Sequence, residues 1–76
     1  MTADRILDAS GLQCPMPLLK TKLELNGMSP GERLVVIATD TGSLRDIPAW
    51  VALSSHQLLS QSEEQGAYRF TIERGA

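Results

Sequence analysis

The run from Leu34 to Thr39 constrains the fold of this chain more than any other feature. It is short, apolar and rich in β-branched residues, which is typical of a central strand buried on both faces. Its apolar stretch is also far shorter than the ~20 residues that a membrane helix needs. A chain of 76 residues can bury only about 60% of its surface. We therefore expect one domain over residues 1–76, with one small core and no deep cleft for a large cofactor.

The segment before this run predicts a strand followed by a helix. Arg5 to Ala9 has the composition of a short strand, which Ser10-Gly11 ends. From Leu18 onward the pattern is helical, because Leu18, Leu19, Leu23 and Asn26 or Gly27 recur at spacings of three and four. Asn26-Gly27 supplies the stop, because glycine accepts the left-handed conformation just past a helix end.

A second helix is expected after the central run. Ser43 and Asp46 stand three apart and resemble a capping box in which Asp replaces Glu. Pro48 must lie near the first turn, so the start of this helix could also be Asp46. The apolar periodicity ends at about Ser55.

The remaining residues predict an antiparallel pair of strands. Gln57 to Ser62 forms the first, and Glu63 to Gly66 is the hairpin loop. The second alternates apolar and polar residues, with Tyr68, Phe70 and Ile72 on the buried face. Because a strand-helix-strand unit makes its strands parallel, the order βαβαββ predicts a mixed sheet. The expected fold is an α/β (α+β) two-layer sandwich, with two helices on one face of four strands.

Charge and cysteine content narrow the classes of function. Nine acidic against seven basic residues give a net charge of −2, which argues against direct binding of nucleic acid. The start at Met1 lacks the basic and apolar segments of a signal peptide. One cysteine cannot form an internal disulfide, nor a zinc site with the single histidine, His56. We expect a cytoplasmic, monomeric protein without a metal or organic cofactor.

The most informative segment is Cys14-Pro15-Met16-Pro17. Pro15 suits the first position of a helix, which would make Cys14 the N-cap, facing the free N–H groups of the first turn. The helix dipole would then lower the pKa of the thiol. Cys14 is therefore a candidate nucleophile, although nothing in the sequence brings His56 close enough to act as its base. The other interpretation is that Cys14 packs as a small hydrophobe.

Three functions for such a thiol remain open. The first is a protein that carries a group on its thiol sulfur. The second is a non-catalytic regulatory or redox-sensing module that binds other proteins, and the third is a thiol that senses peroxide. Other candidate site residues each have two interpretations. Lys20, Lys22 and Arg45 form either a basic docking rim or a solvated face. Asp46 is either a docking residue or a cap, and Asp40 is either a site residue at the end of a buried strand or a loop cap. The aromatic residues are expected in the core, namely Trp50, Tyr68 and Phe70.

The chain resembles the TusA/SirA-like family of sulfur carrier proteins over nearly its whole length. The resemblance rests on Leu7-Asp8-Ala9, Gly11-Leu12, Cys14-Pro15-Met16-Pro17, Pro30-Gly31-Glu32, Ala38-Thr39-Asp40 and Arg45-Asp46-Ile47-Pro48-Ala49-Trp50. It implies a two-layer α/β sandwich in which Cys14 accepts a sulfane sulfur as a persulfide. The donor would be a protein such as a cysteine desulfurase, and an acceptor protein would take the sulfur onward. In some members this relay leads to 2-thiolation of the tRNA wobble uridine.

Within that resemblance, Pro15 and Pro17 support the motif around Cys14, and no cofactor beyond the transient persulfide sulfur is implied. Partner docking is expected at Met16, Lys20, Arg45 and Asp46. The chain departs from the wobble-uridine members at Met16, where they tend to carry an acid. It also lacks the cysteine that some relatives have in the second helix, which excludes chemistry with a second thiol.

Overall fold

A computed structural model describes residues 4–76, and residues 1–3, on which the signal-peptide expectation partly rests, lie outside the described residues. The six elements follow the expected order βαβαββ. They are β1 (Arg5–Ala9), α1 (Met16–Asn26), β2 (Arg33–Ala38), α2 (Ser43–Leu53), β3 (Gln57–Glu64) and β4 (Ala67–Glu73).

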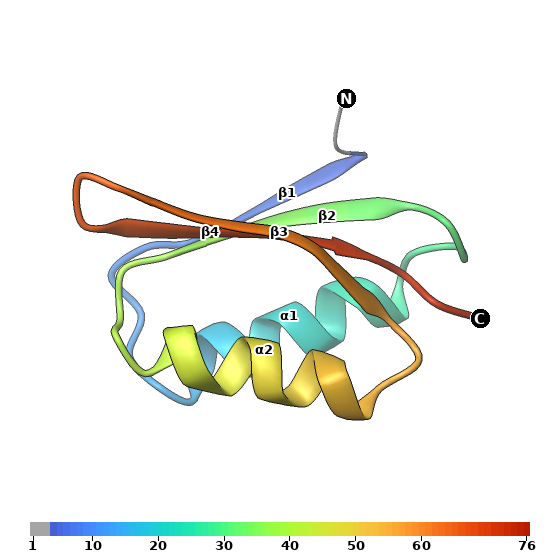
Figure 1. The fold of residues 1–76 in the computed structure, drawn as a ribbon, viewed down its shortest axis with the longest axis horizontal. Coiled ribbons are helices and arrows are strands. Elements are labelled where there is room, and N and C mark those ends of the chain that lie inside the picture. The colour runs from blue at the N-terminus through green and yellow to red at the C-terminus, as the bar shows by residue number, and fades with distance from the viewer. Residues whose placement is uncertain (1–3) are drawn as a thin grey trace.

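The four strands form one mixed sheet in the order β1-β2-β4-β3. β1 pairs parallel with β2, and β4 pairs antiparallel with both β2 and β3. Both crossovers, through α1 and through α2, move in the same direction across the sheet. Because such crossovers are right-handed, they place both helices on the same face, as Figure 1 shows. The two-layer sandwich predicted from the sequence is confirmed.

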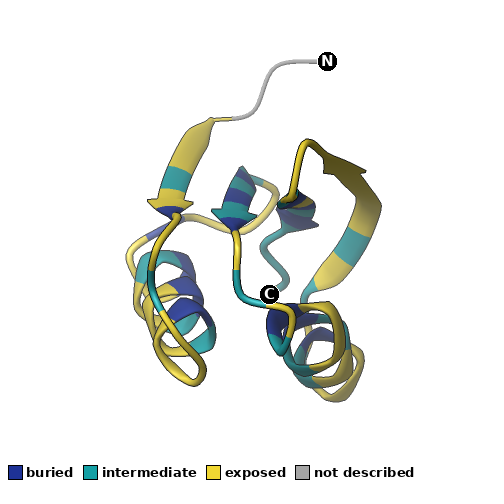
Figure 2. Ribbon diagram, turned by 90° about the vertical axis from the view of Figure 1, so that its left-hand side faces the viewer, coloured by how far each residue is buried: buried dark blue, intermediate teal, exposed yellow. Residues whose placement is uncertain are grey.

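The core lies between the helices and one face of the sheet (Figure 2). Its fully buried residues include Leu25, Leu34, Val36, Ile47, Phe70 and Ile72. The expectation that the central strand is buried on both faces is wrong. In β2, Leu34, Val36 and Ala38 are buried, whereas the alternate residues are only half-buried, because no helix covers the second face of the sheet.

The inner face of α1 also differs from the prediction. Pro17, Thr21 and Leu25 face the sheet and are fully or almost fully buried, whereas Leu19 and Leu23 are 43% and 71% exposed. The helix begins at Met16, two residues before the expected start, and its buried residues recur every fourth position. Thr21 is tolerated in the core because its hydroxyl donates a 2.8 Å hydrogen bond to the Pro17 carbonyl.

α2 begins at Ser43, the residue that the sequence predicts as its cap, so the helix starts earlier than expected and the capping box is absent. The residue before the helix is Gly42, and no side chain caps the first turn. Ser43 is buried, and the carboxylate of Asp46 bonds elsewhere. Pro48 lies inside the helix, beyond the first turn, and α2 ends at Leu53 rather than at Ser55.

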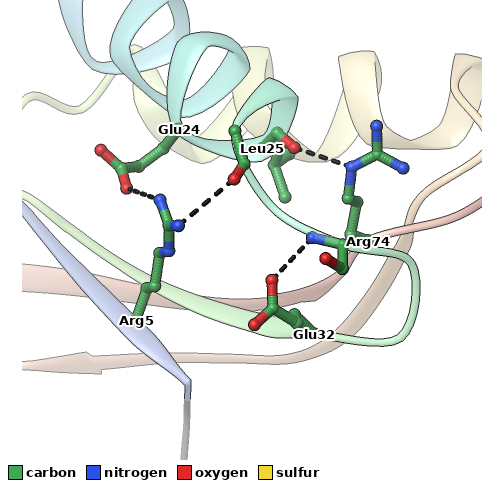
Figure 3. A network of polar contacts seen from close by, with 7 residues as sticks. Arg5, Glu24, Leu25, Glu32 and Arg74 are labelled. Carbon is green, nitrogen blue, oxygen red and sulfur yellow. Dashed lines mark hydrogen bonds and ion pairs between the residues drawn. The ribbon is translucent and has the colours of Figure 1, made fainter.

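The C-terminal end of α1 is held by two arginines from other elements (Figure 3). The helix has no basic residue in its own last turn. Arg5 of β1 donates to the Gly27 carbonyl at 3.2 Å and to the Glu24 carboxylate at 3.0 Å. Arg74, which follows β4, donates through Nε to the Leu25 carbonyl at 2.8 Å. Positive charge here complements the negative end of the helix dipole.

The hairpin between β3 and β4 is tighter than predicted. β3 extends to Glu64, and Gln65 and Gly66 alone connect the strands, instead of a loop from Glu63 to Gly66. Both residues have positive φ, 52° and 79°, as a two-residue turn of this twist requires. Among residues 4–76, no helix is long and apolar enough to cross a membrane.

Candidate functional site

The site lies where the two parallel strands end. Ala9 of β1 and Ala38 of β2 are paired in register, so the loops that follow them leave the same edge of the sheet. Figure 1 shows these loops running together toward the start of the two helices. The Thr39 hydroxyl also accepts a 2.9 Å hydrogen bond from the Gly11 N–H, which joins the loops. Ligands and reactive groups often occupy this edge of an α/β sheet.

Cys14 lies in a tight turn just before α1. The Met16 N–H donates to the Gln13 carbonyl at 2.8 Å, and the peptide bond between Cys14 and Pro15 is cis. The N-cap of α1 is Pro15, with Pro17 in the first turn. The prediction that Cys14 is the N-cap is therefore wrong, because the helix begins one residue later than that assignment requires. The Met16 N–H is not available to the thiol, since it closes the turn.

The thiol instead contacts the second helix. Cys14 is exposed, and its Sγ donates a hydrogen bond to Asp46 Oδ2 at 2.7 Å. Asp46 lies in the first turn of α2, and its other carboxylate oxygen lies 3.7 Å from Arg45 Nε. Asp46 is therefore the partner of Cys14 and does not cap α2, and its role in docking stays a prediction.

This contact reverses the expected shift of the thiol pKa. The hydrogen bond from Cys14 to Asp46 raises the pKa of the thiol above its ordinary value, and desolvation and the charges of Asp46 and Asp40 raise it further. Arg45 opposes the shift. A thiolate would stand beside two carboxylates, which disfavours the charged form. The prediction of a lowered pKa is therefore wrong.

Gly42 allows the two loops to approach closely. A Cβ atom at this position would lie 3.3 Å from Cys14 Cβ and 3.5 Å from Cys14 Sγ. The same atom would lie 2.8 Å from Asp40 Oδ2, which accepts a hydrogen bond from the Gly42 N–H at 3.0 Å. Asp40 caps its loop, as one of the two interpretations of the sequence predicts.

The other predicted docking residues are accessible without contacting the thiol. Met16 is 42% exposed, Lys20 is exposed on α1, and the Arg45 side chain is 87% exposed. Lys22 does not extend the expected basic rim as a free charge, because its ammonium lies 5.4 Å from the centre of the Trp50 ring. Their role in docking stays a prediction.

The histidine and the aromatic residues lie away from the thiol. His56 follows the far end of α2, where its Nδ1 accepts a hydrogen bond from the Gly75 N–H at 2.9 Å. Tyr68 and Phe70 are buried in the core, and Trp50 packs against it, so the expected core role is confirmed. Within residues 4–76, no three His, Cys, Asp or Glu side chains are grouped to hold a metal ion.

The pairing of Cys14 with Asp46 and the role of Gly42 were missed from the sequence. A usable signal was nevertheless present. Two parallel strands place their following loops at one edge, so the segment after Ala9 and the segment after Ala38 had to meet. The residues of the second loop and of the first turn of α2 were thus the natural partners for Cys14.

Comparison with known proteins assigns this arrangement to a family. A small α/β sandwich with one exposed thiol at the carboxyl edge of its parallel strands matches the family model described as sulfurtransferase TusA, over residues 5–74. The chain belongs to the TusA sulfurtransferase family.

Individual relatives agree over most of their length. The chain is 43% identical to a putative sulfur carrier protein YrkI of Bacillus subtilis, covering 99% of this chain and 100% of the relative. It is 46% identical to the sulfur carrier protein TusA of Allochromatium vinosum, covering 93% of each. A crystal structure of a SirA-like protein from Desulfitobacterium hafniense superposes with a TM-score of 0.80 at 22% identity, covering 95% of this chain and 99% of that one. That last likeness supports the fold alone.

Proposed function

We propose that this protein is a sulfur carrier that holds a sulfane sulfur as a persulfide on Cys14. The observation that carries the proposal is a single exposed thiol, fixed in a tight turn, in a chain whose family model covers residues 5–74. Relatives at 41% to 46% identity bear the name sulfur carrier protein TusA. A thiol that passes sulfur between proteins needs access more than enclosure, and Cys14 has it.

The transfer chemistry follows thiol–disulfide exchange. The sulfur of Cys14 attacks the terminal sulfur of a persulfide on the donor protein, and the donor cysteine leaves. The terminal sulfur on Cys14 is later attacked by a thiolate of the acceptor protein, and Cys14 leaves in turn. No metal or organic cofactor takes part in either step.

The donor proposed here is a cysteine desulfurase, and the acceptor is a second sulfur-relay protein. Each would dock transiently on the exposed surface around Cys14, which includes Met16, Lys20 and Arg45. A cytoplasmic monomer fits this role, since one carrier molecule serves both partners in turn. The net charge of −2 supports delivery toward 2-thiolated tRNA without direct contact with the nucleic acid.

Intact-mass measurement tests the carrier function. The protein is incubated with a cysteine desulfurase and cysteine, and then its mass is measured without reductant. We expect an adduct of one sulfur atom on the wild type and none on Cys14→Ser. If the wild type gains no sulfur, or if the adduct persists in Cys14→Ser, the proposal is wrong. The thiolation state of tRNA in a deletion strain tests the proposed pathway separately.

The raised pKa of Cys14 bears equally on the carrier and the peroxide-sensing functions, because both use the thiolate. The regulatory module remains as the second candidate, and it predicts that partner binding survives in Cys14→Ala. A pull-down with a desulfurase before and after this substitution, read together with the mass measurement, separates the two functions.

A further inference from the structure

In the Cys14–Asp46 contact, the structure holds a carboxylate oxygen within hydrogen-bond distance of the thiol. Asp46 Oδ2 lies 2.7 Å from the Cys14 sulfur, and no side-chain hydrogen bond caps α2, so this oxygen has no competing role at the helix end. The other oxygen faces Arg45 Nε at 3.7 Å. The exposed fraction of the Asp46 side chain is only 26%. The first turn of α2 therefore holds the Asp46 carboxylate against the Cys14 thiol.

We propose that Asp46 holds the proton of the unloaded Cys14 thiol and so keeps the empty site in its less reactive form until sulfur is loaded. The second half of the inference, which concerns sulfur loading, rests on the proposed carrier function. Its first half, the holding of the thiol proton, stands on the contact alone and can be tested without any sulfur donor.

The loading step can be written with every atom accounted for. An electron pair on Cys14 Sγ forms a bond to the terminal sulfur of the donor persulfide, and the sulfur–sulfur bond of the donor breaks. The donor cysteine leaves as a thiolate with that electron pair. The Cys14 proton passes to solvent, and the departing donor thiolate takes up a proton from solvent in turn. The transferred sulfur keeps its oxidation state, so no oxidant or reductant is required.

Loading also removes the contact. The sulfur of a persulfidated Cys14 carries no proton, so it cannot donate to Asp46. The terminal sulfur is then an anion near two carboxylates, Asp46 and Asp40, with the Arg45 guanidinium as the opposing charge. Repulsion favours a terminal sulfur that points away from α2 and toward solvent, where an acceptor thiolate can reach it. The hydrogen bond thus marks the unloaded state.

Replacing the carboxylate has two opposite consequences for reactivity. For each unit by which the thiol pKa falls, the thiolate fraction near neutral pH rises about tenfold, while the nucleophilicity of each thiolate falls about threefold. The net gain near neutral pH is about threefold per unit, and the loss at alkaline pH is about threefold. The two rate profiles must therefore cross. A substitution that loosens the structure also breaks this contact, so circular dichroism must first show that each variant is folded.

The test compares variants of the full chain by alkylation with iodoacetamide across pH, with the ultraviolet absorbance of the thiolate as a second readout. Asp46→Asn is expected to shift the titration of Cys14 to lower pH and to give the crossed rate profile. Arg45→Ala is expected to shift it to higher pH, because the Arg45 charge lowers the thiol pKa. The matched control is Glu24→Gln, which removes one negative charge at the opposite end of α1 and should leave the profile unchanged.

A wild-type profile for Asp46→Asn would overturn the proposal. If Asp46→Asn does not fold, Arg45→Ala decides instead, because Arg45 is exposed and this variant should fold. A shift of its Cys14 titration to lower pH, or no shift, then overturns the proposal. Failure of the carrier function would give a different result from failure of this proposal. In that case the Asp46→Asn titration still shifts, whereas neither the wild type nor the variant gains sulfur from the desulfurase.

Discussion

Arg74 should contribute more to stability than any other surface charge, because it bonds the end of α1 from outside the helix. Its Nε donates to the Leu25 carbonyl at 2.8 Å, and Leu25 is itself fully buried. The informative change is Arg74→Met. It keeps the apolar stem of the side chain and removes the guanidinium, so that packing is largely preserved and the loss reports on the charged hydrogen bond.

The expected cost follows from three features of the contact. A hydrogen bond from a charged donor contributes about 1.5–3 kcal/mol, and a cation at a partly buried helix C-terminus contributes up to ~2 kcal/mol. These two contributions overlap, because the same atoms make them. Arg74 is half-buried, so solvent screens part of its charge, and about 2 kcal/mol remains. In a domain this small, that corresponds to a fall in melting temperature of roughly 8–16 °C.

The measurement is urea unfolding followed by circular dichroism at constant pH and salt. The midpoint for Arg74→Met should fall with an unchanged dependence on urea, which indicates a change in stability rather than in compactness. Arg5→Met should cost less than about 1 kcal/mol, because the Arg5 side chain is 43% exposed. Arg69→Met, an exposed arginine on β4, is the control. If Arg74→Met costs no more than Arg69→Met, the account of the helix end is wrong.

Three further predictions follow from the core, from His56 and from the site. Phe70→Ala should cost about 3–5 kcal/mol, most of the stability of a small domain, and circular dichroism should find it largely unfolded at 37 °C (about 310 K). Burial and the charge of Arg74 lower the pKa of His56, so the unfolded chain binds the proton more readily and stability should fall as pH drops through about 6.5. A urea midpoint that is independent of pH in the wild type, or one equally dependent in His56→Gln, would contradict this. Gly42→Ala should slow alkylation of Cys14, because the new methyl group approaches the thiol, whereas Gly31→Ala, at a φ of 90°, should lower stability and leave the alkylation rate unchanged.

Elements set by local pattern could be predicted from the sequence. The bounds of β1 agree with the prediction, because Ser10-Gly11 ends the strand. The alternation of Tyr68, Phe70 and Ile72 identified the buried face of β4, since only one face of this strand meets the helices.

Features set by packing could not be predicted. Leu19 and Leu23 have helical spacing and apolar side chains, yet they face solvent, because a helix with several leucines can bury either of two faces. Thr21 can lie in the core because its hydroxyl donates a hydrogen bond to the helix backbone. Sequence pattern does not rank such alternatives.

The chemistry of the site was predicted only in part. Cys14 was identified by its two prolines, but the direction of its pKa was wrong because the reasoning considered only the neighbouring helix. The decisive group, Asp46, comes from a different element, and only the pairing of β1 with β2 brings it to the thiol. Electrostatics at this site depends on tertiary structure, so local reasoning about a helix end gave the opposite sign.

The distance in sequence between the two partners has a consequence for the denatured chain. Cys14 and Asp46 are 32 residues apart, so their contact exists only when both loops are in place. An unfolded or newly made copy has an ordinary thiol with a larger thiolate fraction, and it reacts faster with oxidants and alkylating agents than the native protein. Copies in which the contact is not formed are therefore labelled faster than the native protein, and the fold lowers the reactivity of the cysteine that it presents to solvent.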